Sequence, residues 1–332
     1  MQLLAAAILC AGIGMSPADA VSVSEGYVSI EPGVRLYYRK LGDGKQVVVS
    51  PMASWLASPL ASLARKDRTL ILYDTRGRGR SDSVEASKVS FANELSDLDA
   101  VRRHFGLEKV ALAGWSHYGM MTAVYAIQHP DRVTRVVQIT PGGPRSDPYL
   151  QQGMQTIRSR VDGEAYQALQ EKKKAGAFDK DPAGYCRAMI GVVRPAFFGN
   201  RADMAKMTFD ECAFENEWPD NQDKWWGALF ASMTPWDYRE GARASKVPRL
   251  VIQGEKDFIP LEGSREWVAG NPNARLLVIP GVGHHPFVEN APIFLAAVED
   301  FLDGKWPEGA QEIPSAETPK PTAALARPGH AR

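Results

Sequence analysis

The order of apolar and polar positions along this chain predicts strands that alternate with helices. Short apolar runs, of the kind that a parallel sheet buries on both faces, recur in the first 140 residues and again after residue 240. Between them lie segments such as Phe91–Phe105, whose apolar residues recur at helical spacing. This alternation predicts an α/β protein with a mostly parallel, doubly wound sheet. The expected strands are Gln46–Ser50, Thr69–Tyr73, Val110–Ala113, Val133–Ile139, Arg249–Gln253 and Arg275–Ile279.

Both ends of this pattern carry further elements. Tyr27–Ile30 and Val34–Lys40 are expected to open the sheet as a β-hairpin, because Glu31-Pro32-Gly33 between them is a turn sequence. A helix is expected over Trp55–Arg65, and another closes the pattern over Pro292–Leu302.

The alternation breaks at Pro141–Pro144, and from there to about residue 240 the chain is mostly helical. We therefore divide the mature chain into an α/β core, residues 21–140 and 241–305, and an inserted helical cap, residues 141–240. Residues 306–332 are rich in Pro, Ala, Glu and Lys, a composition that predicts a disordered tail.

The N-terminus resembles an export signal. Leu3–Ile13 is an apolar run, and Ala18-Asp19-Ala20 fits a small-x-small cleavage site. This predicts a signal peptide over residues 1–20 and a secreted or periplasmic protein, because the run is too short to span a membrane. An oxidising compartment permits Cys186 and Cys212 to pair, although two separate buried thiols fit the sequence equally.

Composition excludes several classes of function. Lys+Arg and Asp+Glu both total 39, so no basic excess points to nucleic acid or to an anionic membrane as a partner. The spacing of His and Cys gives no metal site, and no phosphate-binding or dinucleotide fingerprint is present, so neither metal nor cofactor is expected. The sequence gives no signal for an oligomeric state.

Candidate chemistry begins at Ser116. The strand Val110–Ala113 stops at Gly114, Ser116 follows, and a helical pattern starts at once, which is the arrangement of a nucleophile elbow. A serine hydroxyl becomes a good nucleophile only when a base takes its proton. Asp257 and His284 each follow a predicted strand, and the order Ser, Asp, His is the one that this sheet architecture uses. The rival candidates are His285 for the base, and Glu255 or Asp237 for the acid.

Two further motifs make the pattern specific. Asp74–Ser81 reads D-x-R-G-x-G-x-S, and Gly281–Pro286 reads G-x-G-H-x-P. With these motifs the mature chain resembles the α/β-hydrolase superfamily over nearly its whole length. The resemblance implies the α/β-hydrolase fold and acyl transfer, with Ser116 as nucleophile, His284 as general base and Asp257 as the acid that orients it. The Asp74–Ser81 turn is expected to hold loops near the site.

The resemblance also implies an oxyanion hole formed by the backbone N–H groups of His117 and Ala53, with Met52 as the neighbouring alternative. Two residues depart from the family pattern. Met52 stands where glycine is usual, and Tyr118 stands where a small residue avoids a clash. We expect both side chains to contact substrate.

Two cap segments, Asp181–Arg187 and Cys212–Pro219, resemble the proline-iminopeptidase-like group. Glu211, Glu215 and Glu217 form an acidic cluster in the cap. The resemblance implies that Glu215 and Glu217 bind the free amine of a substrate, whereas an ion pair within the cap, or a solvated position, is the alternative for the cluster. The first hypothesis is a serine hydrolase that cleaves an N-terminal peptide bond or a small ester. The alternatives are a carboxylesterase or lactonase without aminopeptidase activity, and a non-catalytic binding protein that keeps the fold.

Overall fold

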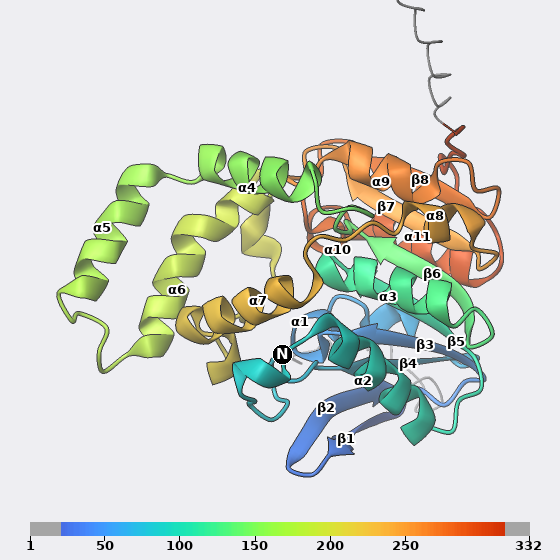
Figure 1. Ribbon diagram of the computed structural model, residues 1–332, viewed down its shortest axis with the longest axis horizontal. Helices are drawn as coiled ribbons and strands as arrows, with labels where there is room; N and C mark the ends of the chain where they lie inside the picture. The colour runs from blue at the N-terminus through green and yellow to red at the C-terminus, as the bar shows by residue number, and fades with distance from the viewer. Residues whose placement is uncertain (1–20, 316–332) are drawn as a thin grey trace, which may run out of the picture.

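The computed structural model describes residues 21–315 and contains an eight-stranded sheet in the order β1-β2-β4-β3-β5-β6-β7-β8 (Figure 1). β1 pairs antiparallel with β2, and β2 pairs antiparallel with β4. All other neighbours are parallel, as predicted. The strands are β1 (Val23–Glu31), β2 (Val34–Leu41), β3 (Gln46–Pro51), β4 (Arg68–Tyr73), β5 (Val110–Trp115), β6 (Val133–Ile139), β7 (Arg249–Gly254) and β8 (Ala274–Ile279).

Helices lie between successive strands from β3 onward and after β8. α2, α3, α8 and α9 pack side by side in a row against the sheet (Figure 1). Every residue of β4, β5 and β7 is buried, which explains why these strands appear in the sequence as continuous apolar runs. The helices that precede β6 or follow β7 are α1 (Ala53–Leu56), α2 (Phe91–His104), α3 (His117–Gln128), α9 (Leu261–Val268), α10 (Pro286–Glu289) and α11 (Ala291–Leu302).

The helix expected over Trp55–Arg65 is wrong as a single element. The structure has only the short helix α1 and, after a break, one 3₁₀ turn over Ala61–Leu63. Pro59 lies between them. Proline lacks the N–H that a continuing helix needs, and it disfavours helical backbone at the residue before it.

The chain between β6 and β7 is helical, and residues 149–233 of it project away from the sheet at one side (Figure 1). Asp162 and Asp181 cap two of its helices by accepting backbone N–H groups, which fixes where α5 and α6 begin. A disulfide joins Cys186 to Cys212, so the pairing that the sequence left open is present. The helices of this segment are α4 (Tyr149–Arg160), α5 (Gly163–Lys174), α6 (Pro182–Val193), α7 (Pro219–Met233) and α8 (Arg239–Ala244).

The prediction of a disordered tail from residue 306 is wrong for residues 306–315. Gln311 forms a bridge with Leu276 of β8, and Gly270 donates its N–H to the carbonyl of Ile313. Trp306 packs against Phe301 with ring centroids 5.1 Å apart. These contacts hold the segment against β8 and the helix over Ala291–Leu302, and composition alone did not reveal them. The predicted signal peptide and residues 316–332 lie outside the described residues.

No helix within residues 21–315 combines the length and the apolar character that crossing a bilayer requires.

Candidate functional site

Ser116 lies at the sharp turn between β5 and α3. Its backbone has φ 58° and ψ −126°, a conformation that residues with a side chain rarely adopt. Two glycines let the strand end and the helix start approach closely. A Cβ on Gly114 would lie 2.2 Å from the carbonyl oxygen of Tyr118, and one on Gly119 would lie 2.8 Å from the carbonyl oxygen of Gly114. The small residue that the elbow needs is therefore Gly119, three positions after the serine.

The structure brings the three predicted catalytic side chains together. Nε2 of His284 lies 3.0 Å from Oγ of Ser116. Nδ1 of His284 lies 3.0 Å from each carboxylate oxygen of Asp257. His284 and Asp257 are buried, whereas Ser116 is partly exposed. This continuous chain of contacts has the geometry of a nucleophile, a base and an orienting acid.

Four neighbours that the sequence did not single out hold this chain in place. Nε1 of Trp115 and Oγ1 of Thr140 donate hydrogen bonds to the carbonyl oxygen of His284, over 2.8 and 3.2 Å. Nε2 of Gln253 and the backbone N–H of Ile259 each donate to the carboxylate of Asp257 over 3.0 Å. Trp115, Thr140 and Gln253 lie at or next to strand ends, which the sequence indicated, but which partner each would meet depends on the fold.

The turn at Pro51–Ser54 lies after β3, at the same edge of the sheet. Met52 has φ 69° and ψ 56°, so its backbone takes the left-handed conformation that glycine would adopt without strain. The turn geometry is therefore kept despite the loss of glycine. Among the residues that the structure describes, none accepts a hydrogen bond from the backbone N–H of Ala53 or of His117.

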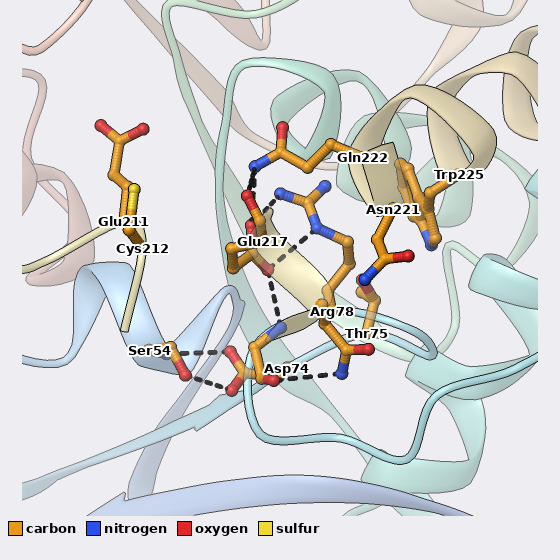
Figure 2. Close-up of polar contacts among 12 residues, drawn as sticks. Ser54, Asp74, Thr75, Arg78, Glu211, Cys212, Glu217, Asn221, Gln222 and Trp225 are labelled. Atoms are coloured by element: carbon orange, nitrogen blue, oxygen red, sulfur yellow. Dashed lines mark hydrogen bonds and ion pairs between the residues drawn. The ribbon is translucent and has the colours of Figure 1, made fainter. Parts of the chain in front are cut away.

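Asp74 binds Ser54 of this turn through its carboxylate (Figure 2). Its carboxylate accepts from the backbone N–H and the Oγ of Ser54, over 2.8 and 2.5 Å, and from the backbone N–H of Arg80 over 2.9 Å. Burial raises the pKa of Asp74 to about 6, because the hydrogen bonds that favour the ionised form only partly offset desolvation. The expectation that the Asp74–Ser81 turn holds loops near the site agrees with these contacts.

Tyr118 fits into the elbow because its ring turns toward this same motif. Its hydroxyl lies 3.1 Å from Oγ1 of Thr75 and 3.4 Å from Nη1 of Arg78. The side chain of His117 points elsewhere, with Nε2 lying 2.6 Å from the Oε2 of Glu94. Glu94 lies on the apolar face of α2, four residues before Leu98. An acidic residue at such a position was the only signal in the sequence for the contact between His117 and Glu94.

Ser116 and His284 line a cavity of about 490 Å³. Met52 and Tyr118 also line it. Three arginines, Arg78, Arg145 and Arg194, also contribute to its wall, and no aspartate or glutamate within residues 21–315 does. The aromatic residues of the wall are Trp55, Trp115, Tyr118, Tyr149, Phe197, Trp226, Phe230, Trp236 and Phe258. The cavity is thus suited to a bulky apolar group.

The expectation that Glu215 and Glu217 bind substrate is wrong in this structure. Glu215 is exposed and lies outside the cavity wall. Glu217 is buried, and its two oxygens lie 3.0 and 2.7 Å from Nε and Nη2 of Arg78 (Figure 2). Glu211 is likewise paired with Arg194. The alternative of an ion pair within the cap applies to Glu211, while Glu217 pairs with the core turn instead.

The contacts of the rival residues are with groups other than the serine. His285 is buried, stacks on Phe198 with ring centroids 4.6 Å apart, and has a pKa well below the ordinary range because of burial and the nearby charge of Arg194. Glu255 is exposed and accepts the backbone N–H of Gly281 over 2.8 Å. Asp237 is exposed and pairs with Arg239 over 2.6 Å.

Comparison with known proteins identifies the family. Residues 51–291 match the family model described as the alpha/beta hydrolase fold, so the chain belongs to the α/β-hydrolase family and the predicted fold class is confirmed. Since its relatives are hydrolases of this fold, the comparisons support a hydrolase.

The individual relatives differ in what they act on. The chain is 25% identical over 291 residues to a 2-hydroxy-6-oxononadienedioate/2-hydroxy-6-oxononatrienedioate hydrolase of Paraburkholderia phymatum, covering 83% of this chain and 94% of the relative. It is 25% identical over 295 residues to a proline iminopeptidase of Lactobacillus helveticus, covering 82% and 95%. Among solved structures, an enol-lactonase from Burkholderia xenovorans LB400 matches with a TM-score of 0.55 and 21% identity, covering 84% and 100%. At that identity the structural match establishes the fold alone.

Proposed function

We propose that this protein is a serine hydrolase that cleaves carboxylic esters or lactones with a bulky apolar acyl group. The observation that carries the proposal is the chain of contacts from Asp257 through His284 to Oγ of Ser116 at the wall of an apolar cavity. Ester and lactone cleavage need only this machinery, because water supplies the second nucleophile.

In the proposed reaction, Oγ of Ser116 attacks the ester carbonyl carbon while Nε2 of His284 takes the hydroxyl proton. Asp257 keeps Nδ1–H of His284 directed toward itself and stabilises the imidazolium that forms. The backbone N–H groups of Ala53 and His117 bind the oxyanion. His284 then returns the proton to the leaving alcohol, and water, activated by the same histidine, hydrolyses the acyl-enzyme.

The charges around the cavity favour an ester over a peptide with a free N-terminal amine. A bound ammonium group needs a carboxylate, but Glu211 and Glu217 are already paired with arginines, and Glu215 is exposed. The arginines of the wall are the partners in such pairs, Arg78 with Glu217 and Arg194 with Glu211, so these pairs leave no carboxylate free for an ammonium group. The resemblance of the cap to iminopeptidases therefore does not extend to an amine site.

A fluorophosphonate probe tests the serine, and a substrate panel tests the class. We expect the probe to label the wild type and not Ser116→Ala, and 4-nitrophenyl esters to be cleaved while prolyl and other aminoacyl arylamides are not. Absence of labelling would support the non-catalytic binding protein instead. Arylamide cleavage at rates like those of esters would refute the ester assignment and restore the aminopeptidase hypothesis.

We further propose that the protein acts outside the cytoplasm, in the periplasm or after secretion. The predicted signal peptide over residues 1–20 motivates this, and the disulfide between Cys186 and Cys212 is of a kind that persists in oxidising compartments. N-terminal sequencing of the protein from a fractionated host should give Val21 in the exported fraction. A full-length chain confined to the cytoplasm would contradict the proposal.

A further inference from the structure

The carboxylate of Glu217 is fully occupied by the Asp74–Ser81 turn and its surroundings. Besides the two contacts with Arg78, it accepts the backbone N–H of Gly79 over 2.7 Å and Nε2 of Gln222 over 3.1 Å (Figure 2). Glu217 comes from the segment between β6 and β7, just before α7, while the turn belongs to the sheet side of the molecule. This one buried carboxylate therefore binds the cap to the Asp74–Ser81 turn.

Neighbouring cap residues bind the same turn through its carbonyl groups. Nδ2 of Asn216 donates to the carbonyl oxygens of Gly79 and Ser81, over 3.1 and 2.8 Å. Nε1 of Trp225 donates to the carbonyl oxygen of Arg76 over 2.9 Å. The guanidinium of Arg78 also lies 4.8 Å from the ring centroid of Trp225. The position of the turn thus depends on where the cap docks.

Gly79 links this cap contact to the turn at Pro51–Ser54. It has φ +50°, and a Cβ on it would lie 2.3 Å from Oδ2 of Asp74 and 2.7 Å from Oγ of Ser54. The backbone of Gly79 is thus in direct contact with the carboxylate that fixes Ser54. A displacement of Gly79 would displace Asp74 and Ser54 with it, because closely packed buried groups have no free volume to absorb the change.

We propose that Glu217 is a positioning residue that transmits cap docking, through Gly79 and Asp74, to the oxyanion donor on Ala53. The inference rests on the proposed serine-hydrolase function, since Ala53 precedes Ser54 directly and its N–H is one of the two donors proposed there. A donor stabilises the tetrahedral oxyanion only at hydrogen-bond distance from the place where charge develops. Glu217 thereby makes full activity conditional on a docked cap, without touching the substrate.

Two measurements on the full mature chain test this. The first compares kcat and KM for 4-nitrophenyl butyrate in the wild type, Glu217→Gln and Ser54→Ala, together with the double variant. Asp220→Asn is the matched control, because it removes an exposed carboxylate three residues away, whose ion pair is with Lys173 and not with the Asp74–Ser81 turn. The second measures amide hydrogen exchange over residues 52–57 by mass spectrometry.

We expect Glu217→Gln to lower kcat by about ten- to a hundredfold, below the loss caused by removing an oxyanion donor outright, with KM within about threefold. The double variant should lose little more than Glu217→Gln, because both changes act along one path. Exchange over residues 52–57 should accelerate in Glu217→Gln and stay unchanged in Asp220→Asn. A kcat within twofold of the wild type, multiplicative losses in the double variant, or unchanged exchange would each overturn the proposal.

Glu217→Gln leaves Arg78 without its buried counter-ion, so Asn216→Ala serves if that variant does not fold. Asn216→Ala removes two hydrogen bonds to the turn without stranding a charge, and the same fall in kcat and rise in exchange are expected. Failure of the proposed function has a different signature: a wild type that cleaves no ester and resists fluorophosphonate labelling. Even then the exchange measurement still tests the coupling between cap and turn.

Discussion

Both carboxylate oxygens of Asp257 lie 3.0 Å from Nδ1 of His284, on the side of the ring away from Ser116. This contact fixes the proton on Nδ1 and leaves Nε2 free to accept the serine proton. Asp257→Asn keeps the shape of the side chain but favours the wrong tautomer. We expect kcat for esters to fall by about four orders of magnitude with KM little changed.

The control for this prediction is Asp237→Asn, which removes one of the two rival acids at an exposed position and should leave kcat within about twofold. Steady-state ester kinetics measure both variants. If Asp237→Asn carried the larger loss, the assignment of Asp257 as the orienting acid would be wrong.

Met52 combines a left-handed backbone with a buried side chain that lines the cavity. Met52→Gly and Met52→Ala both remove the side chain, but only glycine relieves the backbone strain. The glycine variant should therefore be the more stable of the two by about 1 kcal/mol in urea unfolding. Both variants should also gain activity on longer acyl esters relative to short ones. Equal stabilities would show that the turn at Pro51–Ser54 is not strained.

The raised pKa of Asp74 predicts a pH-dependent contribution to stability. A carboxyl whose pKa rises from 3.8 to about 6 on folding favours the folded state at low pH, and this contribution is lost as pH rises through that window. Asp74→Asn loses hydrogen bonds but does not titrate. The stability difference between wild type and variant should therefore narrow by up to about 3 kcal/mol from pH 4 to pH 7, measured by urea unfolding. A stability difference between the wild type and Asp74→Asn that widens as pH rises would contradict a raised pKa of Asp74.

The disulfide between Cys186 and Cys212 closes a loop with a sequence separation of 26. Replacing both cysteines by serine should lower the free energy of unfolding by about 3 kcal/mol, because the unfolded chain regains the entropy of that loop. Thermal unfolding with and without dithiothreitol checks this. The reductant should destabilise the wild type and have no effect on the double variant, which is the internal control. If dithiothreitol destabilised the wild type and the double variant equally, its effect would not come from breaking this disulfide.

The local sequence pattern was sufficient to predict much of the α/β core. The apolar runs at Val110–Ala113 and Arg249–Gln253 are strands because parallel strands are buried on both faces, and this burial shows directly in the sequence. The elbow at Ser116 could be located for a similar reason, since strand, turn and helix are contiguous. The helix over Trp55–Arg65 failed because the helical periodicity masked the break at Pro59.

The contacts of the residues on the substrate side of the site could not be predicted from the sequence. Glu217 was expected to meet a substrate amine, yet its partner is Arg78, 139 positions earlier in the chain. Residues 306–315 were expected to be disordered, yet Ile313 and Trp306 pack on the core. In each case the deciding contact joins segments that are distant in sequence and adjacent only after folding.

The sequence by itself determined the strand–helix alternation, the mostly parallel sheet and the Ser-Asp-His order at strand ends, because hydrophobic periodicity and short turn motifs are local properties. Tertiary structure alone decided which carboxylates are neutralised, that the cysteines pair, and that the cavity wall carries arginines instead of acids. A buried charge takes whichever counter-ion the fold brings within reach, since leaving it unpaired away from water is too costly, and no local pattern records that choice.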